Sequence, residues 1–280
     1  MRHLAPKPYT PFARRLATLC GATLAAVTVG ASQARAQTDY YNTDAGRPIT
    51  VEDAYAIERR ALEIQIAPLR LERSRGGRYA WGIEPEVAVG LFPRTQVELG
   101  LPFSYLDSGE GRRLRGLAGI DVSILHNLNV ETSIPALAIA ADVLIPAGPL
   151  GPDKAYPSLK GIMTRTFSWA RFHVNAQYTF SERIASAGPG GELSQWLGGV
   201  AVDRTFPLES FLVTAELVAR QPLIEGEDLR WDSGAGIRYQ LSPRVAADAG
   251  AGYRMTGSDT GWFLTFGAAV SLGLPWTPRR

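Results

Sequence analysis

Charged side chains occupy alternate positions in several stretches of this sequence, and their sign changes along the chain. The first part contributes acids: Glu63, Glu84, Glu86, Glu98, Asp121 and Asp142. The later part contributes mostly bases, which include Arg171, His173, Arg220, Arg238 and Arg254. If these side chains line opposite walls of one interior, they create a transverse field that could orient a polar or zwitterionic solute. The alternative is an interior closed by ion pairs that satisfy one another.

Catalysis has little support in the same residues. His173 and Asn175 would share one face of a strand, as the base and orienting group of a hydrolase do. Such an enzyme also needs a serine within reach of the histidine, and no serine stands in a suitable motif. No spacing suggests a metal, cofactor or nucleic-acid site, and the sole cysteine is Cys20. We therefore expect neither an enzyme nor a cofactor.

Strands must position these residues, because apolar and polar side chains alternate with period two. Between Thr95 and Asp107, for example, Val97 and Leu99 alternate with Gln96 and Glu98. Pro68 interrupts the alternation of the first stretch and predicts a β-bulge there. The pattern predicts twelve strands, at 61–72, 78–91, 95–107, 116–125, 134–146, 158–167, 171–181, 195–205, 211–221, 230–241, 245–255 and 261–272.

Strand and connection lengths favour a membrane barrel over a soluble β protein. All twelve predicted strands have ten or more residues, which suits the roughly 9–11 tilted residues that cross a bilayer. Short connections such as 92–94 and 242–244 alternate with longer ones such as 148–157 and 182–194. Aromatic residues gather near strand ends, as in interfacial girdles. We predict an all-β fold, a closed antiparallel transmembrane β-barrel of about 12 strands.

The N-terminal residues predict export. Arg14 and Arg15 precede the apolar stretch 16–29, and Ala34-Arg35-Ala36 forms a small-residue cleavage site. This pattern is typical of a secretory signal peptide, here 1–36. Five of the 29 basic residues and none of the 27 acidic ones precede residue 37, which leaves the rest a net charge of −3. The basic balance of the whole chain is thus no argument for nucleic-acid binding.

A different kind of segment separates the signal from the barrel. Residues 37–60 are expected to be periplasmic or to fold partly into the barrel mouth. Thr50 and Asp53 resemble an N-cap with an acid three residues later, which predicts a short helix from about residue 50. The barrel itself is expected to span 61–274.

Five short segments stand out as motifs: Arg47-Pro48-Ile49-Thr50-Val51-Glu52-Asp53-Ala54, Glu58-Arg59, Leu62-Glu63-Ile64-Gln65, Gly82-Ile83-Glu84-Pro85-Glu86 and Thr95-Gln96-Val97-Glu98-Leu99-Gly100. They resemble the family of outer-membrane transporters named for the MetA pathway of phenol degradation. The resemblance implies a barrel and the passage of small molecules. It brings no site residues with it.

These observations together predict an outer-membrane channel or transporter for small molecules, including aromatic or hydrophobic ones. The alternative is a closed structural or adhesion barrel without a transport role. The expected partners are outer-membrane lipid, a small solute and the barrel-assembly machinery during biogenesis. Nucleic acid is not expected among them.

Overall fold

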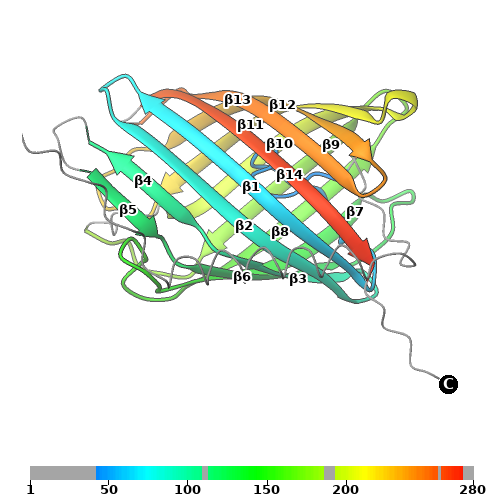
Figure 1. Ribbon diagram of the computed structural model, residues 1–280, viewed down its shortest axis with the longest axis horizontal. Coiled ribbons are helices and arrows are strands. Elements are labelled where there is room, and N and C mark those ends of the chain that lie inside the picture. Colours follow the sequence, from blue (N-terminus) through cyan, green and yellow to red (C-terminus); the bar gives the residue numbers. More distant parts are fainter. Residues whose placement is uncertain (1–41, 109–112, 186–192, 258–259, 274–280) are drawn as a thin grey trace, which may run out of the picture.

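The computed structural model describes residues 42–108, 113–185, 193–257 and 260–273. The predicted signal peptide 1–36 and its cleavage site lie outside the described residues. Within the described ranges the chain forms one antiparallel sheet that closes on itself, because β1 pairs with both β2 and β14 (Figure 1). The strands are β1 (Ala61–Ser74), β2 (Tyr79–Phe92), β3 (Thr95–Gly100), β4 (Phe103–Asp107), β5 (Arg113–Leu117), β6 (Ile120–Asn127), β7 (Ala136–Ile145), β8 (Tyr156–Thr166), β9 (Arg171–Thr179), β10 (Ser194–Phe206), β11 (Phe211–Pro222), β12 (Arg230–Ser242), β13 (Val245–Arg254) and β14 (Gly261–Gly273).

Two pairs of these strands are single barrel strands with a local break. β3 and β4 pair one after the other with β2, and β6 and β5 pair with β3 and β4 in turn. Pro102, which has no N–H, marks the first break, and Gly119 with φ +132° marks the second. Hydrogen bonds continue across both breaks, from Leu101 N to Pro85 O and from Ala118 N to Pro102 O. Counted this way the barrel has twelve strands, which confirms the predicted architecture.

The predicted bulge in β1 is also confirmed. The register of β1 against β14 shifts between Gln65 and Leu69, and the register against β2 shifts between Ile66 and Leu69. As a result Glu63 and Gln65 face inward before the bulge, and Arg70 and Glu72 face inward after it. One extra residue therefore exchanges the two faces of the strand, as period-two geometry requires.

The distribution of side chains is the reverse of that in a soluble protein. Large apolar residues stand on the outer face, where Val87, Leu99 and Ile237 are 39%, 48% and 44% exposed. The largest fully buried side chains include the polar residues Arg238 and His173, both inside the barrel. An apolar exterior around a polar interior is the arrangement that hydrocarbon demands of a barrel. None of the described residues belongs to a helix long and apolar enough to cross a membrane.

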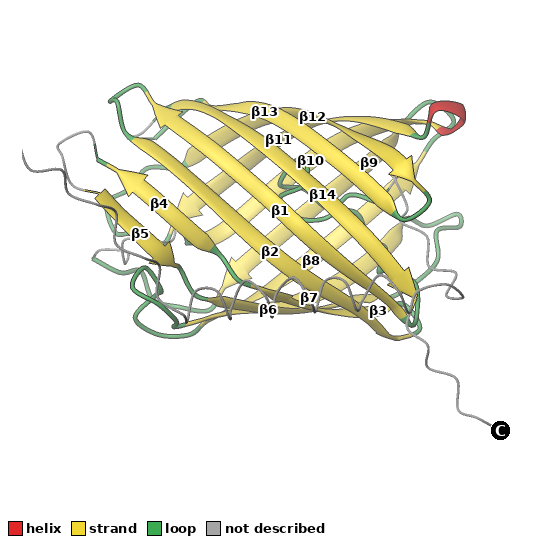
Figure 2. Cartoon of the chain, viewed as in Figure 1, coloured by secondary structure: helices red, strands yellow, loops and turns green. Residues whose placement is uncertain are grey.

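The predicted helix at residue 50 is wrong. Residues 42–60, which we term the inner segment, contain no helical residue. Residues 42–57 lie inside the barrel, and residues 58–60 are exposed just before β1. Figure 2 shows one helical turn in the described chain, Pro207–Glu209, at a strand connection. Tertiary contacts override the capping pattern at Thr50. Side chains of the barrel wall accept hydrogen bonds from the backbone N–H groups that a helix would use.

Candidate functional site in the barrel interior

The inner segment follows the inside of the wall from one group of strands to the next. Its backbone N–H groups donate to side chains of β11, β9, β8 and β3. The bonds run from Thr50 and Val51 to Glu216 Oε2 (2.8 and 3.0 Å), Glu52 to Asn175 Oδ1 (2.9 Å), Ala54 to Thr164 Oγ1 (3.0 Å) and Ile57 to Gln96 Oε1 (2.7 Å). Polar side chains of the wall thus replace the water that an irregular backbone would otherwise need.

Glycines on the inner face let the segment approach the wall. A Cβ at Gly199 of β10 would lie 2.6 Å from Val51 Cγ2. A Cβ at Gly90 of β2 would lie 2.0 Å from the carbonyl oxygen of Glu58. Both glycines stand at inward positions, where any larger residue would push the inner segment away. The interior is therefore shaped to hold this part of the chain.

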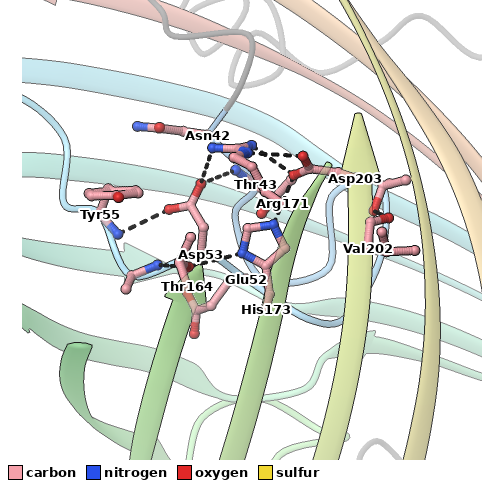
Figure 3. Close-up of polar contacts among 12 residues, drawn as sticks. Asn42, Thr43, Glu52, Asp53, Tyr55, Thr164, Arg171, His173, Val202 and Asp203 are labelled. Carbon is pink, nitrogen blue, oxygen red and sulfur yellow. Dashed lines mark hydrogen bonds and ion pairs between the residues drawn. The ribbon is translucent and has the colours of Figure 1, made fainter. Parts of the chain in front are cut away.

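A cluster around His173 fastens the middle of the inner segment (Figure 3). His173 Nδ1 is 2.9 Å from Thr164 Oγ1, and its Nε2 is 2.8 Å from Asp203 Oδ2. Arg171 makes two hydrogen bonds to the same carboxylate, at 2.9 and 2.7 Å, and lies 3.9 Å from Asp53 of the inner segment. Thr164, His173 and Asp203 therefore each have a hydrogen-bond partner.

The order hydroxyl, imidazole, carboxylate resembles that of a nucleophilic triad, but its surroundings are those of a structural link. Thr164 is fully buried and already accepts the N–H of Ala54. A nucleophile needs an open side from which a substrate can approach, and here the inner segment covers it. The arrangement therefore holds Ala54 and Asp53 against the wall.

A second cluster fastens the beginning of the inner segment. Arg47 pairs with Asp44 and lies 3.6 Å from Glu63 and 3.8 Å from Asp248. Arg238 lies 3.1 Å from Asp44, 3.5 Å from Asp248, and donates to the carbonyl oxygen of Arg47 at 3.2 Å. Both arginine side chains are 1% exposed. Buried charges of both signs compensate one another here, and separating them would leave a costly unpaired charge.

The remaining predicted bases are also engaged within the wall. Arg220 lies 3.1 Å from Asp232, and Arg254 lies 3.4 Å from Asp232 and 3.6 Å from Glu72. The basic side of the predicted transverse field is thus largely neutralised by local acids. The sequence allowed two alternatives, a transverse field or an interior closed by ion pairs. In this part of the barrel the structure contains the ion pairs.

The acidic side is different. Glu84, Glu86 and Asp121 gather around Gly100, where an added Cβ would lie 2.7 Å from Glu84 Oε1 and 3.4 Å from Glu86 Cγ and from Asp121 Cβ. Among the described residues no arginine, lysine or histidine lies within ion-pair distance of these three carboxylates.

Two further acids complete this group. Glu98 accepts hydrogen bonds from Gln96 Nε2 (2.9 Å) and Ser123 Oγ (3.0 Å), and Asp142 accepts one from Ser158 Oγ (3.3 Å). Neither has an ion-pair partner among the described residues. The five carboxylates on β2, β3, β6 and β7 form what we term the acidic wall. The charge of Lys160 on β8 acts on Glu98, Asp121 and Asp142, but its ion pair is with Glu52 of the inner segment.

The inner segment also reaches the strand connection 128–135. Tyr55 Oη donates to Glu131 at 3.4 Å, and Glu131 accepts the N–H of Thr166 at 2.7 Å. Partial desolvation raises the pKa of Glu131, but the hydrogen bonds from Thr166 and the charge of Arg165 outweigh it and lower the pKa below its ordinary value. Glu131 therefore stays an ionised anchor for Tyr55.

Sequence reasoning identified some of these residues and missed others. The contacts bring Glu63, Arg171, His173 and Arg238 together with the inner segment. Thr164 as the partner of His173 was missed, as was the role of Asp44, Arg47 and Asp53, because no local pattern marks a contact between segments so far apart. The described residues contain no group of three or more His, Cys, Asp or Glu side chains placed to hold a metal ion.

Comparison with known proteins identifies the fold. No family model matches the sequence, and no curated protein matches it either. Among solved structures, the COG4313 outer membrane channel from Pseudomonas putida F1 superposes with a TM-score of 0.54 and 10% identity, covering 79% of this chain and 98% of that one.

Two other solved structures have lower scores. The KdgM porin has a TM-score of 0.45 and 12% identity, covering 74% of this chain and 98% of that one. The CymD monoaromatic hydrocarbon channel has a TM-score of 0.44 and 7% identity, covering 77% and 89%. At such identities the similarity concerns the backbone. The chain has the fold of an outer-membrane β-barrel channel.

Proposed function

We propose that this protein is an outer-membrane channel that passes small solutes, including aromatic or hydrophobic ones, and that its inner segment lies in their path. The observation that carries the proposal is the combination of an apolar exterior with an acidic wall whose carboxylates have no ion-pair partner. A barrel built only for mechanical stability gains nothing from interior carboxylates that make no ion pair. The resemblance to the family named for the MetA pathway of phenol degradation supports the same function.

Orientation follows from the connections. The chain enters β1 at the end of the barrel that carries the short connections 93–94 and 243–244. The opposite end carries the long connections 146–155, 180–193 and 223–229. Since short turns face the periplasm in barrels of this kind, we assign the first end to the periplasm and the second to the outside. Export through a cleaved signal peptide 1–36, assembly by the barrel-assembly machinery and contact with outer-membrane lipid belong to this proposal.

The inner segment sets the condition for passage. A twelve-stranded barrel has a narrow interior, and the inner segment contacts wall residues from β1 to β14. We infer that solute moves through when this segment shifts away from part of the wall. A closed barrel that only serves as structure is the second candidate, favoured by the many hydrogen bonds that hold the segment in place.

A reversible cross-link tests the proposal. A Cβ at Gly199 would lie 2.6 Å from Val51 Cγ2, so Val51→Cys with Gly199→Cys puts two thiols on residues in direct contact, as a disulfide requires. The rest of the chain after residue 36 has no cysteine. We expect the oxidised protein to conduct less in planar bilayers than the same protein after reduction.

Two comparisons complete the experiment. Val51→Cys alone cannot form the bond and should conduct equally before and after reduction. If well-folded wild-type protein shows neither conductance nor liposome swelling, and removal of residues 42–56 does not produce any, the channel function is wrong and the structural barrel is correct.

A further inference from the structure

The outer face of β1, β2, β4 and β5 changes in character toward the end that carries the long connections. Strand pairing sets its side chains in three rows. The first row holds Leu69, Ile83, Phe103 and Leu117, the second Leu71, Trp81, Tyr105 and Arg115, and the third Arg73, Tyr79, Asp107 and Arg113. Successive rows are two residues apart, about 6.6–6.8 Å along a strand. The surface therefore passes from apolar through aromatic to basic within a short distance.

This order indicates depth in a membrane. The first row has the composition of a hydrocarbon contact. In the second row the rings of Trp81 and Tyr105 stack, with centroids 5.8 Å apart and planes 15° apart. Aromatic residues in such a row mark the boundary between hydrocarbon and head groups. The arginines of the second and third rows then lie at head-group level.

The basic residues of this surface are exposed, and they outnumber its acidic residues. Arg73, Arg113 and Arg115 are all exposed, and the side chain of Arg113 is 71% exposed. Arg113 pairs with Asp107 at 3.0 Å, whereas Arg73 and Arg115 have no ion-pair partner among the described residues. Three guanidinium groups against one carboxylate leave a surplus of two positive charges in the three rows. We term Arg73, Arg113, Arg115, Tyr79, Trp81 and Tyr105 the arginine face.

Outward arginines at the opposite end of the barrel have partners within the protein. Arg204 lies over the ring of Phe206, with Cζ 5.3 Å from the centroid. Arg94 donates to the carbonyl oxygen of Leu128 at 3.1 Å. Both side chains contact other groups of the protein, so the two residues provide a control for substitutions in the arginine face.

We propose that the arginine face binds the phosphate groups of a phosphorylated glycolipid in the outer leaflet of the membrane. Guanidinium groups bind phosphate oxygens in pairs of parallel hydrogen bonds and lose little hydration in doing so. The apolar and aromatic rows beneath would contact the acyl chains and the sugar of the same molecule. This inference rests on the proposed outer-membrane location and orientation, and it is independent of whether the barrel conducts.

The test is binding of bisphosphorylated lipid A to delipidated, folded protein in detergent, followed by native mass spectrometry. EDTA is present throughout, so that divalent cations cannot bridge lipid and protein. The variant Arg73→Gln/Arg113→Gln/Arg115→Gln should bind at least about tenfold more weakly than wild type, since each arginine near an anionic lipid surface contributes about 1 kcal/mol. The control Arg94→Gln/Arg204→Gln/Arg244→Gln adds Arg244, which lies at the same end in the connection 243–244. It should bind as wild type does, and dephosphorylated lipid A should bind weakly to all three proteins.

The proposal is overturned if the first variant keeps wild-type affinity, if the control loses as much, or if the dephosphorylated lipid binds equally well. Heat-modifiable gel mobility verifies folding. If the triple variant does not fold, Arg115→Gln alone, at an exposed residue without an ion-pair partner, should still bind more weakly, and wild-type affinity there overturns the proposal as well. Conductance is measured on the same samples. Its absence in wild type would contradict the channel function and leave the lipid site unaffected.

Discussion

Val51 packs its side chain directly onto the backbone of Gly199, with Cγ2 2.6 Å from the place a Cβ would occupy. A Cβ at the neighbouring Gly198 would have no atom within 4 Å. The two glycines are adjacent in β10 and therefore point to opposite faces: Gly199 faces the inner segment, whereas Gly198 faces outward, where a Cβ would meet nothing.

We predict that Gly199→Ala destabilises the barrel and Gly198→Ala does not. Overpacking at Val51 costs about 1–3 kcal/mol, whereas Ala in place of an unconstrained strand glycine gains about 0.5–1 kcal/mol. The temperature of the heat-modifiable shift on gels should fall for the first variant and hold or rise for the second. Equal behaviour of the two variants would mean that the inner segment does not press on β10.

A second prediction concerns the facing of β2. Val87 belongs to a row of outward apolar residues, Ile64, Val87, Leu99, Val122 and Val143, which crosses five barrel strands. Val87→Arg should impair folding by about 2–4 kcal/mol, the cost of a charge on the lipid face at the midplane. Glu86→Arg should be tolerated, because it places the new charge beside the acids of the inner wall. Urea titration in lipid vesicles measures both, and similar losses would show that the register is shifted by one residue.

A third prediction addresses the acidic wall. Glu84→Gln/Glu86→Gln/Glu98→Gln should lower the preference for cations while the barrel remains folded, because none of these carboxylates holds an arginine in place. Reversal potentials under a salt gradient report the preference, and heat-modifiable mobility reports the folding. Loss of the folded form would reveal a structural role for these acids. An unchanged reversal potential would show that ions do not pass beside them.

A fourth prediction concerns the cluster that fastens the beginning of the inner segment. Arg238→Ala removes the charge that faces Asp44 and Asp248 and should cost about 3–5 kcal/mol, as breaking one side of a buried ion pair does. The inner segment should then become accessible to protease in the folded barrel. Arg94→Ala, which removes an exposed arginine with a single carbonyl contact, is the control. Protection equal to wild type in Arg238→Ala would mean that other contacts suffice.

The sequence predicts the barrel well because period-two alternation is a local signal. Each stretch shows its two faces by itself, and even the bulge near Pro68 is visible as a change of phase. The breaks at Pro102 and Gly119 were not predicted, since each strand continues in the same direction across them. The predicted ends differ from the observed ones by a few residues.

The interior could be predicted only in part. Alternation identifies His173 as inward, but it does not give the register that sets Thr164 opposite it. The contacts of the inner segment were missed for a related reason, although the sequence suggested that residues 37–60 are periplasmic or fold partly into the barrel mouth. Its hydrogen bonds to Glu216, Asn175 and Gln96 depend on the closed barrel, whereas the capping pattern at Thr50 is local and suggests a helix. The inward glycines at 90 and 199 were the available sign that another part of the chain approaches the wall.

The inner segment also imposes an order on assembly. It precedes β1 in the chain, yet Asp44 contacts Arg238, which lies 194 positions later. Its partners on β11, β12 and β14 exist as a surface only after the late strands have paired. Contacts of such long range form slowly, because the intervening chain must be ordered before they can stabilise it. The inner segment is therefore synthesised before every strand of the barrel, yet it reaches its final place only after the late strands have formed.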